Sequence, residues 1–343
     1  KEFKTKPAQN ALNDLRGFGI VPDCVVVRSD EQAPGDVATK IAQFSGVPKE
    51  AVILLHNVST VFQIPLTIAA SGINDVLTKF TGNDQVPNLR KWEDIILAQS
   101  TTREKSVTVG LVAKYMQNED TYISVLEALK SAAWHEEANL TIKWINAETA
   151  DEADFKEVDA LLVPGGFGER GVPGKIAAAT YALETGKPYL GICLGLQVAV
   201  IAAARRGGLV DANSSEFDKD TSHDVVYIMA GQEGLESTGG TLRLGDYEAK
   251  LKEGSVTADV YGATAVTERH RHRYEVNQAF TEAIEAGGLI ISGTSPDGRL
   301  VEFVEAPGSS FFVATQAHPE FRSRPNRAHP LFNGLIRAAM ANQ

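Results

Sequence analysis

From residue 106 onward, short apolar runs of strand character alternate with stretches of helical spacing. Strands are expected at 107–112, 140–145, 160–163 and 188–192, and helices at 120–134, 175–184 and 197–204. In the first helix, apolar residues recur three or four positions apart, at Ile123, Leu126, Leu129 and Ala133. This alternation predicts an α/β domain with a mostly parallel sheet covered on both faces. Active groups of such sheets lie at the carboxyl ends of the strands.

A shorter α/β piece precedes this domain. Strands are expected at 24–27 and 51–55, with a helix at 37–44 between them. These elements are too few for a comfortable domain of their own. The polar stretch 82–105, which contains Pro87 and Asn88, has the composition of a linker. We therefore expect a partial domain at 1–81, a linker at 82–105 and a larger domain at 106–343.

Composition narrows the class of protein. The chain has 343 residues and a net charge of −11, which argues against a protein that binds nucleic-acid backbones. No apolar run approaches the length needed to cross a membrane. With only two cysteines, Cys24 and Cys193, a disulfide scaffold or a zinc site is not expected, and a reducing, cytoplasmic compartment is the default.

A candidate nucleophile lies between an expected strand and an expected helix, in Gly191-Ile192-Cys193-Leu194-Gly195. This is the pattern of a nucleophile elbow, with cysteine in place of serine. The glycines leave room for a strained turn, and the following helix directs N–H groups and its positive dipole end toward the sulfur. The alternative is a buried core cysteine, which is the better interpretation for Cys24 beside Val25 and Val26.

Cysteine chemistry also needs a base and a group that orients it. The strand expected at 311–315 is followed by Gln316-Ala317-His318-Pro319-Glu320. If this stretch stays extended, the side chains of His318 and Glu320 point the same way, and the carboxylate can fix the imidazole tautomer. His-x-Glu also occurs at metal sites, but no third ligand accompanies it at recognisable spacing.

Two further motifs carry possible chemistry. Gly165-Gly166-Phe167-Gly168 ends a strand and leaves backbone N–H groups accessible to a substrate oxygen, although it could equally be a flexible turn. In Arg269-His270-Arg271-His272-Arg273-Tyr274-Glu275, a strand would place arginines on one face and histidines on the other. The motif suits a carboxylate or phosphate site, or a structural ladder of ion pairs.

With these residues in place, the sequence resembles the class I glutamine amidotransferases, and among them the CTP synthase family. The resemblance covers essentially the whole chain. Its most specific stretches are Lys4-Thr5-Lys6-Pro7-Ala8-Gln9, Pro164-Gly165-Gly166-Phe167-Gly168-Glu169-Arg170-Gly171, Gly191-Ile192-Cys193-Leu194-Gly195-Leu196-Gln197, Asn213-Ser214-Ser215-Glu216-Phe217, Glu268-Arg269-His270-Arg271-His272-Arg273-Tyr274-Glu275-Val276-Asn277 and His318-Pro319-Glu320-Phe321. It implies a flavodoxin-like glutaminase domain at 106–343, preceded by the C-terminal part of a P-loop-type synthetase domain at 1–81.

The resemblance implies a carbon–nitrogen ligase that aminates UTP to CTP with ATP and with ammonia from glutamine. Cys193 would be the nucleophile, His318 the base and Glu320 its orienter. The implied glutamine-binding residues are Gly166, Leu194, Gly195, Leu196, Gln197, Glu216 and Arg273. Among them, Gly166 and Leu194 would supply oxyanion N–H groups, Glu216 would face the α-amino group and Arg273 the α-carboxylate.

For the nucleotides, the resemblance implies a UTP or CTP site at Lys4, Thr5, Lys6, Pro7, Ala8, Gln9 and Lys40, and ATP contacts at Arg28 and Val58. CTP would act as an inhibitor, GTP as an allosteric activator and Mg²⁺ as the companion of ATP, with no prosthetic group. A homotetramer in the cytoplasm is also implied.

The chain departs from the family pattern in three places. Ala8 replaces the usual threonine, and Ser237-Thr238-Gly239-Gly240 lacks the Asp-Leu expected before the glycine pair. No Gly-x-x-x-x-Gly-Lys-Ser/Thr phosphate loop occurs, so that loop and the magnesium carboxylates are expected upstream of Lys1. We therefore expect this chain alone to hydrolyse glutamine but not to make CTP. Another glutamine-dependent enzyme, or a non-catalytic nucleotide-sensing or assembly module, remains an alternative.

Overall fold

A computed structural model describes residues 3–116, 119–228 and 243–342. The segment 237–240, where the sequence departs from the family pattern, lies outside these residues. The chain divides into two compact units, Lys1–Thr101 and Thr102–Gln343, which are described separately. Within the described ranges, no helix is both long and apolar enough to cross a membrane.

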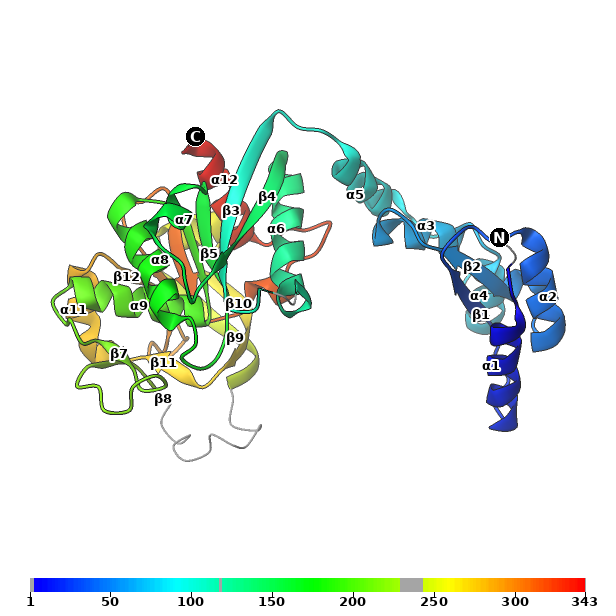
Figure 1. Ribbon diagram of the computed structural model, residues 1–343, viewed down its shortest axis with the longest axis horizontal. Coiled ribbons are helices and arrows are strands. Elements are labelled where there is room, and N and C mark those ends of the chain that lie inside the picture. The colour runs from blue at the N-terminus through cyan, green and yellow to red at the C-terminus, as the bar shows by residue number, and fades with distance from the viewer. Residues whose placement is uncertain (1–2, 117–118, 229–242, 343) are drawn as a thin grey trace. The chain divides into compact units, whose positions relative to one another are not determined.

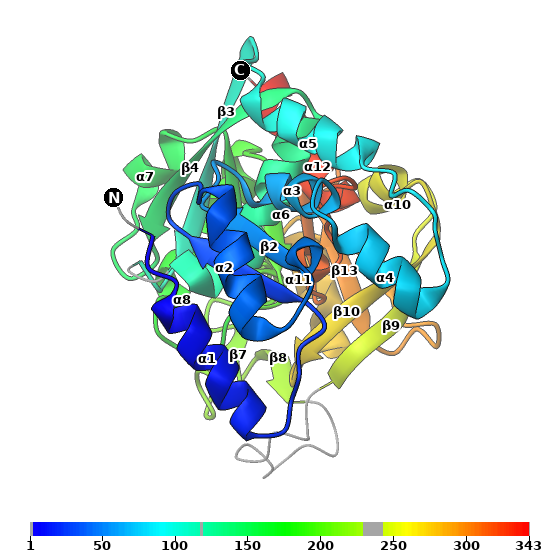
Figure 2. The same cartoon turned by 90° about the vertical axis from the view of Figure 1, so that its right-hand side faces the viewer.

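The small unit is built around two parallel strands, β1 (Val25–Ser29) and β2 (Val52–His56). Its helices are α1 (Lys6–Gly17), α2 (Gly35–Ser45), α3 (Ile64–Ala69), α4 (Ile73–Thr81) and α5 (Arg90–Ser100). Short 3₁₀ turns occupy Lys49–Ala51 and Val61–Gln63. Figure 2 shows α1 and α2 beside the strand pair. One apolar cluster, which includes Ile41, Ala51 and Ile53, forms the core of this unit.

The large unit contains a nine-stranded sheet in the order β10-β9-β12-β13-β14-β6-β5-β3-β4 (Figure 1). These strands are β3 (Lys105–Ala113), β4 (Ala138–Asn146), β5 (Ala160–Val163), β6 (Tyr189–Ile192), β9 (Arg243–Leu251), β10 (Ala265–His272), β12 (Ile290–Thr294), β13 (Val301–Glu305) and β14 (Phe312–Thr315). The five strands from β14 to β4 run parallel, and the remaining pairs are antiparallel. The expected α/β fold with a mostly parallel central sheet is confirmed.

A second, three-stranded sheet has the order β11-β8-β7. It consists of β7 (Asn213–Ser214), β8 (Asp224–Ile228) and β11 (Tyr274–Val276). The Arg-His motif therefore passes from the large sheet into the small one, because Arg273 interrupts the strand between β10 and β11.

Two separate apolar cores show that helices cover both faces of the large sheet (Figure 1). One face carries α7 (Glu152–Lys156), α8 (Val172–Thr185), α9 (Leu194–Arg206) and α11 (Thr281–Ala286). The other carries α6 (Ile123–His135), α10 (Val256–Tyr261) and α12 (Pro330–Ala341). Further 3₁₀ turns lie at Glu119–Tyr122, Gln278–Phe280 and Pro319–Phe321. The buried all-apolar strands β5 and β6 are explained by this coverage.

Candidate active site

Cys193 forms the turn between β6 and α9, and its backbone is strained. Its φ of 52° and ψ of −101° lie in a region of backbone conformation that residues other than glycine rarely adopt. A Cβ at Gly191 would lie 2.6 Å from the Gly195 carbonyl oxygen, and one at Gly195 would lie 2.2 Å from the Val163 oxygen. Both positions therefore need glycine, because the turn packs directly against its own helix and against β5.

Neighbouring strands hold this turn in place. The N–H of Cys193 donates to the Thr315 carbonyl at 2.7 Å, which continues the pairing between β6 and β14. The buried Tyr189 hydroxyl donates to the Gly195 carbonyl at 2.8 Å. Only 2% of Cys193 is exposed, so the sulfur lies in a site largely shielded from water.

His318 and Glu320 follow β14 and form a tight pair. The ring Nδ1 lies 2.7 Å from Glu320 Oε1, and both side chains are largely buried. The stretch is not extended as expected, because Pro319–Phe321 forms a 3₁₀ turn. The turn brings the carboxylate back toward the ring, so the predicted contact arises from a different backbone shape. The N–H of His318 donates to the Arg269 carbonyl at 2.7 Å, which fixes the residue against β10.

Electrostatics favour a charged imidazole in this pair. Burial disfavours the charged ring, but the charges of Glu320 and Cys193 and the hydrogen bonds to them outweigh burial. The pKa of His318 therefore lies well above its ordinary value. Because Glu320 holds Nδ1, the other ring nitrogen is the one available to the sulfur.

Gly165 shows how close the nucleophile and the base lie. A Cβ built on this glycine would be 2.8 Å from His318 Cε1 and 3.4 Å from Cys193 Cβ. Cys193 and His318 therefore meet against the same backbone segment, and any side chain at Gly165 would push into both. The elbow and the His-Pro-Glu segment, 125 positions apart in the sequence, come together as one cluster.

Two lysines support the segment that would receive an oxyanion. A Cβ at Gly166 would lie 3.6 Å from Lys175 Nζ and 3.9 Å from Lys114 Cε. Lys114 donates to the Phe167 carbonyl, and Lys175 donates to the Pro164 carbonyl at 3.4 Å. Burial, with a smaller effect from Lys114, lowers the pKa of Lys175 to about 7. Two lysine side chains thus lie against Gly166, one of the expected oxyanion donors.

The other residues expected to bind glutamine surround this cluster. Leu194, Gly195 and Leu196 form the buried first turn of α9, where the N–H of Leu196 donates to the Cys193 carbonyl at 3.0 Å. Glu216 follows β7 and accepts a hydrogen bond from the Gly168 N–H at 2.7 Å. Burial raises the pKa of Glu216, while Lys114 and Arg273 oppose that rise.

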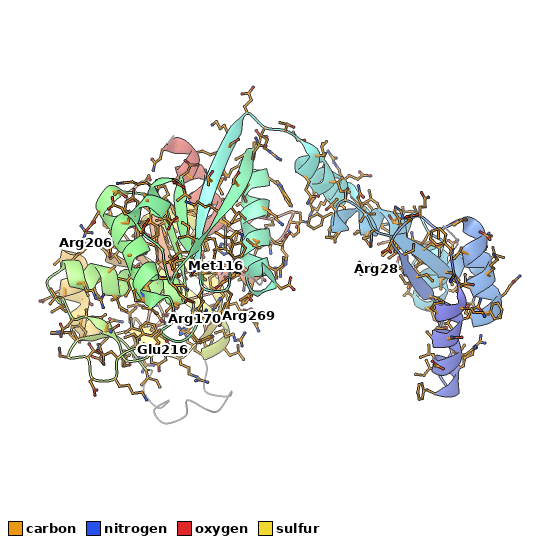
Figure 3. The ribbon with its side chains drawn as sticks, in the orientation of Figure 1. Arg28, Met116, Arg170, Arg206, Glu216 and Arg269 are labelled. Carbon is orange, nitrogen blue, oxygen red and sulfur yellow. The ribbon has the colours of Figure 1, made fainter. Side chains whose placement is uncertain are left out.

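A cavity of about 270 Å³ opens at this end of the large unit. The backbone of the Gly-Gly-Phe loop and His318 form part of its wall, together with Lys114, Tyr115 and Arg271. Figure 3 labels Glu216 and Arg170 at the end of the large unit where the parallel strands terminate, and Arg206 away from it. The candidate site therefore lies at the carboxyl ends of the parallel strands, as expected.

The Arg-His motif divides between the surface and the core. In β10 the arginines are exposed and the histidines buried, as the strand interpretation predicted. Arg271 reaches the cavity wall. The two buried rings lie 2.9 Å apart, between His270 Nδ1 and His272 Nε2.

A buried network of charged side chains lies next to His270 and includes Arg243, Glu275 and Glu302. Arg243 lies 2.6 Å from Glu302 and 3.6 Å from Glu275, and His270 lies 3.5 Å from Glu302. Burial lowers the pKa of His270 to about 3 and raises that of Glu275 to about 8, so both groups are neutral near pH 7. Burial raises the pKa of Glu302 as well, while its hydrogen bond with Arg243 opposes that rise. The histidine face of the motif is therefore structural, and from its arginine face Arg271 lines the cavity.

The residues expected to bind nucleotides lie in the small unit. Thr5 precedes α1, and its hydroxyl accepts a hydrogen bond from Gln9 at 2.9 Å. Lys40 pairs with Asp36 on the surface of α2. Arg28, labelled in Figure 3, donates to Asn57 Oδ1 at 3.4 Å, beside Val58. Because β1 and β2 are parallel, the structure brings Arg28 and the Val58 neighbourhood to the same strand ends. Cys24 is half-buried beside the core of this unit.

Three polar residues of the site were not singled out from the sequence: Lys114, Lys175 and Gln316. Nothing in the local spacing of these residues shows that they turn inward. A buried lysine within an apolar helix, as at Lys175, was the one available signal. In the described part of the chain, no cluster of three or more His, Cys, Asp or Glu residues is arranged to hold a metal ion.

Comparison with known proteins agrees with this geometry. Residues 118–338 match the family described as glutamine amidotransferase class-I, and residues 1–81 match the family described as CTP synthase N-terminus. A CTP synthase of Methanothermobacter thermautotrophicus is 45% identical over 99% of this chain, and one of Carboxydothermus hydrogenoformans is 46% identical over 99%. The chain spans 64% of the length of each of these relatives.

A solved structure is also similar. The glutaminase domain of a Trypanosoma brucei CTPS, with bound acivicin, has a TM-score of 0.63 and 41% identity. The match covers 68% of this chain and 93% of that domain.

Proposed function

Because the chain belongs to the class I glutamine amidotransferases, with the domain matches of the CTP synthase family, we propose that its large unit releases ammonia from glutamine. The whole protein would pass this ammonia to UTP in an ATP-dependent synthesis of CTP. The observation that carries the proposal is the cluster of Cys193 at a strained elbow, His318 beside it and Glu320 at 2.7 Å from the ring.

The first half of the reaction forms a thioester. The Cys193 thiolate attacks the carboxamide carbon of glutamine, and the N–H groups of Gly166 and Leu194 stabilise the resulting oxyanion. The imidazolium of His318 donates its proton to the leaving nitrogen, and ammonia departs as the carbonyl re-forms. Glu320 keeps the ring oriented and charged, which agrees with the raised pKa of His318.

The second half restores the thiolate. His318, now neutral, takes a proton from water, and the hydroxide attacks the glutamyl thioester. Collapse of the second tetrahedral intermediate breaks the carbon–sulfur bond and releases glutamate. The positive charge of Lys114 near Gly166 supports both oxyanions.

Replacing Glu320 by glutamine is expected to move the pH profile of glutamine hydrolysis. The working pair is a thiolate and an imidazolium, and without the carboxylate charge the pKa of His318 falls toward its ordinary value. The alkaline limb of kcat/KM therefore shifts to lower pH, and kcat falls by about 10²-fold. Steady-state ammonia release over pH 5–10 measures both effects. The matched control is Glu127→Gln, an exposed α6 carboxylate paired with Lys130. An unshifted alkaline limb in Glu320→Gln contradicts the assigned role.

For glutamine recognition, Glu216 and Arg273 would hold the α-amino and α-carboxylate groups, and Gln197 would complete the pocket. Arg273 opposes the rise in the pKa of Glu216, and this electrostatic influence supports the pairing. Gly195 and Leu196 would contribute backbone to the same pocket.

Replacing Glu216 by glutamine is expected to raise KM for glutamine about tenfold to 10²-fold, with a smaller change in kcat. An amide of the same shape loses the charge that attracts an ammonium group, and charged hydrogen bonds are worth about 1.5–3 kcal/mol. Initial rates over a glutamine titration give the two constants separately. Glu248→Gln, an exposed carboxylate on β9, serves as the control. An unchanged KM in Glu216→Gln would remove this residue from the substrate site.

For CTP formation, the small unit would hold nucleotides. Its expected UTP or CTP site is Lys4, Thr5, Lys6, Pro7, Ala8, Gln9 and Lys40, and its expected ATP contacts are Arg28 and Val58. ATP would phosphorylate the uracil O4, and ammonia would displace that phosphate at C4. GTP would activate glutamine hydrolysis, CTP would inhibit synthesis, and the protein would work as a homotetramer in the cytoplasm, where Cys193 stays reduced.

Mg²⁺ would accompany ATP in this scheme. The described residues contain no group of three or more His, Cys, Asp or Glu placed to ligate it. For ATP binding, the small unit would contribute the ends of its two parallel strands, where Arg28 contacts Asn57.

A glutamine-analogue alkylating agent tests the proposed hydrolysis. The reagent should modify Cys193 alone, glutamine should protect it, and peptide mapping should find the label between Tyr189 and Arg205. Label on Cys24, or labelling that glutamine does not slow, would count against a glutamine site at the elbow.

A further inference from the structure

A chain of buried amides connects the nucleophile to the strand that follows Arg273. Gln316 comes directly after β14 and has no exposed surface. Its Nε2 lies 3.7 Å from Cys193 Sγ, within hydrogen-bond range of a sulfur acceptor. Its Oε1 accepts from Gln197 Nε2 at 3.3 Å, and the same nitrogen donates to the Tyr274 carbonyl at 3.3 Å.

The direction of this chain of hydrogen bonds is fixed at one end. A backbone carbonyl can only accept, so Gln197 must present its NH₂ group to Tyr274. The second hydrogen of that NH₂ group then points to Gln316, which must present its oxygen in return. The NH₂ group of Gln316 consequently faces the sulfur. The orientation of both amides follows from the network and does not depend on a free choice of amide flip.

The backbone leaves Gln316 little freedom to turn away. Its N–H donates to the Glu302 carbonyl at 2.9 Å, and the preceding Thr315 accepts from the Cys193 N–H at 2.7 Å. The residue is therefore fixed to β13 on one side and sits next to the elbow on the other.

We propose that Gln316 is a further member of the glutamine-hydrolysing site, a hydrogen-bond donor that holds the Cys193 sulfur as a thiolate and couples it through Gln197 to the substrate-binding segment at Arg273–Tyr274. This inference rests on the proposed hydrolysis of glutamine. A donor aimed at the sulfur stabilises the charged thiolate more than the neutral thiol. His318 contributes through charge, whereas Gln316 contributes a neutral, directional donor.

The coupling has a second consequence. Gln197 uses both hydrogens of its NH₂ group on Tyr274 and Gln316, which leaves its oxygen as the acceptor available to a ligand. An incoming ammonium group would bind that oxygen while the rest of the amide keeps the sulfur in place. Substrate contact and nucleophile position are thus set by one rigid unit.

The test compares Gln316→Glu and Gln316→Met by the pH dependence of Cys193 alkylation with iodoacetamide. Glutamate keeps the shape but replaces the donor with a charge that repels the thiolate, and methionine keeps similar length without a donor. The alkylation midpoint should move to higher pH by about one unit or more in Gln316→Glu, and by less in Gln316→Met. kcat for glutamine should fall about tenfold or more in both. The control is Gln278→Glu, an exposed glutamine whose amide contacts only backbone carbonyls.

Alkylation needs no glutamine, so it separates this inference from the proposed function. A wild-type chain that is alkylated at Cys193 but does not hydrolyse glutamine would overturn the proposed function. The effect of Gln316 on the sulfur would still be measured by the alkylation of its variants. Thermal unfolding establishes that each variant is folded. If Gln316→Glu does not fold, Gln316→Met decides. A folded variant with an unmoved midpoint overturns the role of Gln316.

Discussion

Replacing Cys193 by alanine is expected to abolish glutamine hydrolysis, with a loss of at least about 10³-fold in kcat. Without the sulfur no thioester can form, and the remaining groups offer only binding and oxyanion stabilisation. Alanine also fits the space, because the buried side chain loses a single atom. Ammonia release, measured in a coupled assay, reports the loss.

The chain supplies a matched control for this experiment. Cys24 is its other cysteine, half-buried in the small unit, and Cys24→Ala should leave hydrolysis unchanged. Full activity in Cys193→Ala would refute the assignment of the nucleophile, and loss of activity in Cys24→Ala would show that thiol chemistry elsewhere in the chain contributes.

Replacing Gly195 by alanine is expected to damage both stability and activity. The new Cβ would lie 2.2 Å from the Val163 carbonyl oxygen and 3.3 Å from Val163 Cβ, so α9 must move away from β5. Forced overpacking of this kind costs about 1–3 kcal/mol of the free energy of unfolding. Because Cys193 precedes α9 directly, the same movement shifts the sulfur away from His318. Hydrolysis should therefore fall even at temperatures where the variant is folded.

Thermal unfolding and ammonia release measure the two effects of Gly195→Ala separately. Gly35→Ala is the control, since a Cβ at the start of α2 meets nothing within 4 Å. A stable and fully active Gly195→Ala chain would contradict the account of why the elbow requires glycine.

Most of the fold could be predicted from the sequence, because the apolar residues recur with clear strand and helix periodicity. Alternating strand and helix patterns predicted β3–β6 and the helices α6, α8 and α9 to within a few residues, and β5 at 160–163 matched in full. The antiparallel strands at the other side of the sheet were less visible, because their residues mix charged and apolar types. The burial of Glu302 and Glu305 in β13 illustrates this, since their partners Arg243 and Thr257 lie far away in the sequence.

The candidate site was predictable where chemistry is concentrated in a motif and not where it depends on a distant contact. The elbow around Cys193 and the pair His318–Glu320 are short sequence motifs, and the chemistry of their residues explains their spacing. Gln316 has no such pattern, because its importance arises only when β14 pairs with β6 and brings it to the sulfur. The His-Pro-Glu segment was considered as an extended stretch, but Pro319–Phe321 forms a 3₁₀ turn, and the N–H of the preceding His318 donates to the Arg269 carbonyl of β10.

The central claim is that glutamine is attacked by the Cys193 sulfur under control of the neighbouring imidazole. Rapid acid quenching during turnover, followed by mass analysis of the peptides, tests it most directly. The account predicts a glutamyl adduct on the peptide that contains Cys193, accumulating further in His318→Ala if any acylation persists. Steady hydrolysis with no adduct at Cys193, or an adduct on another residue, would contradict it.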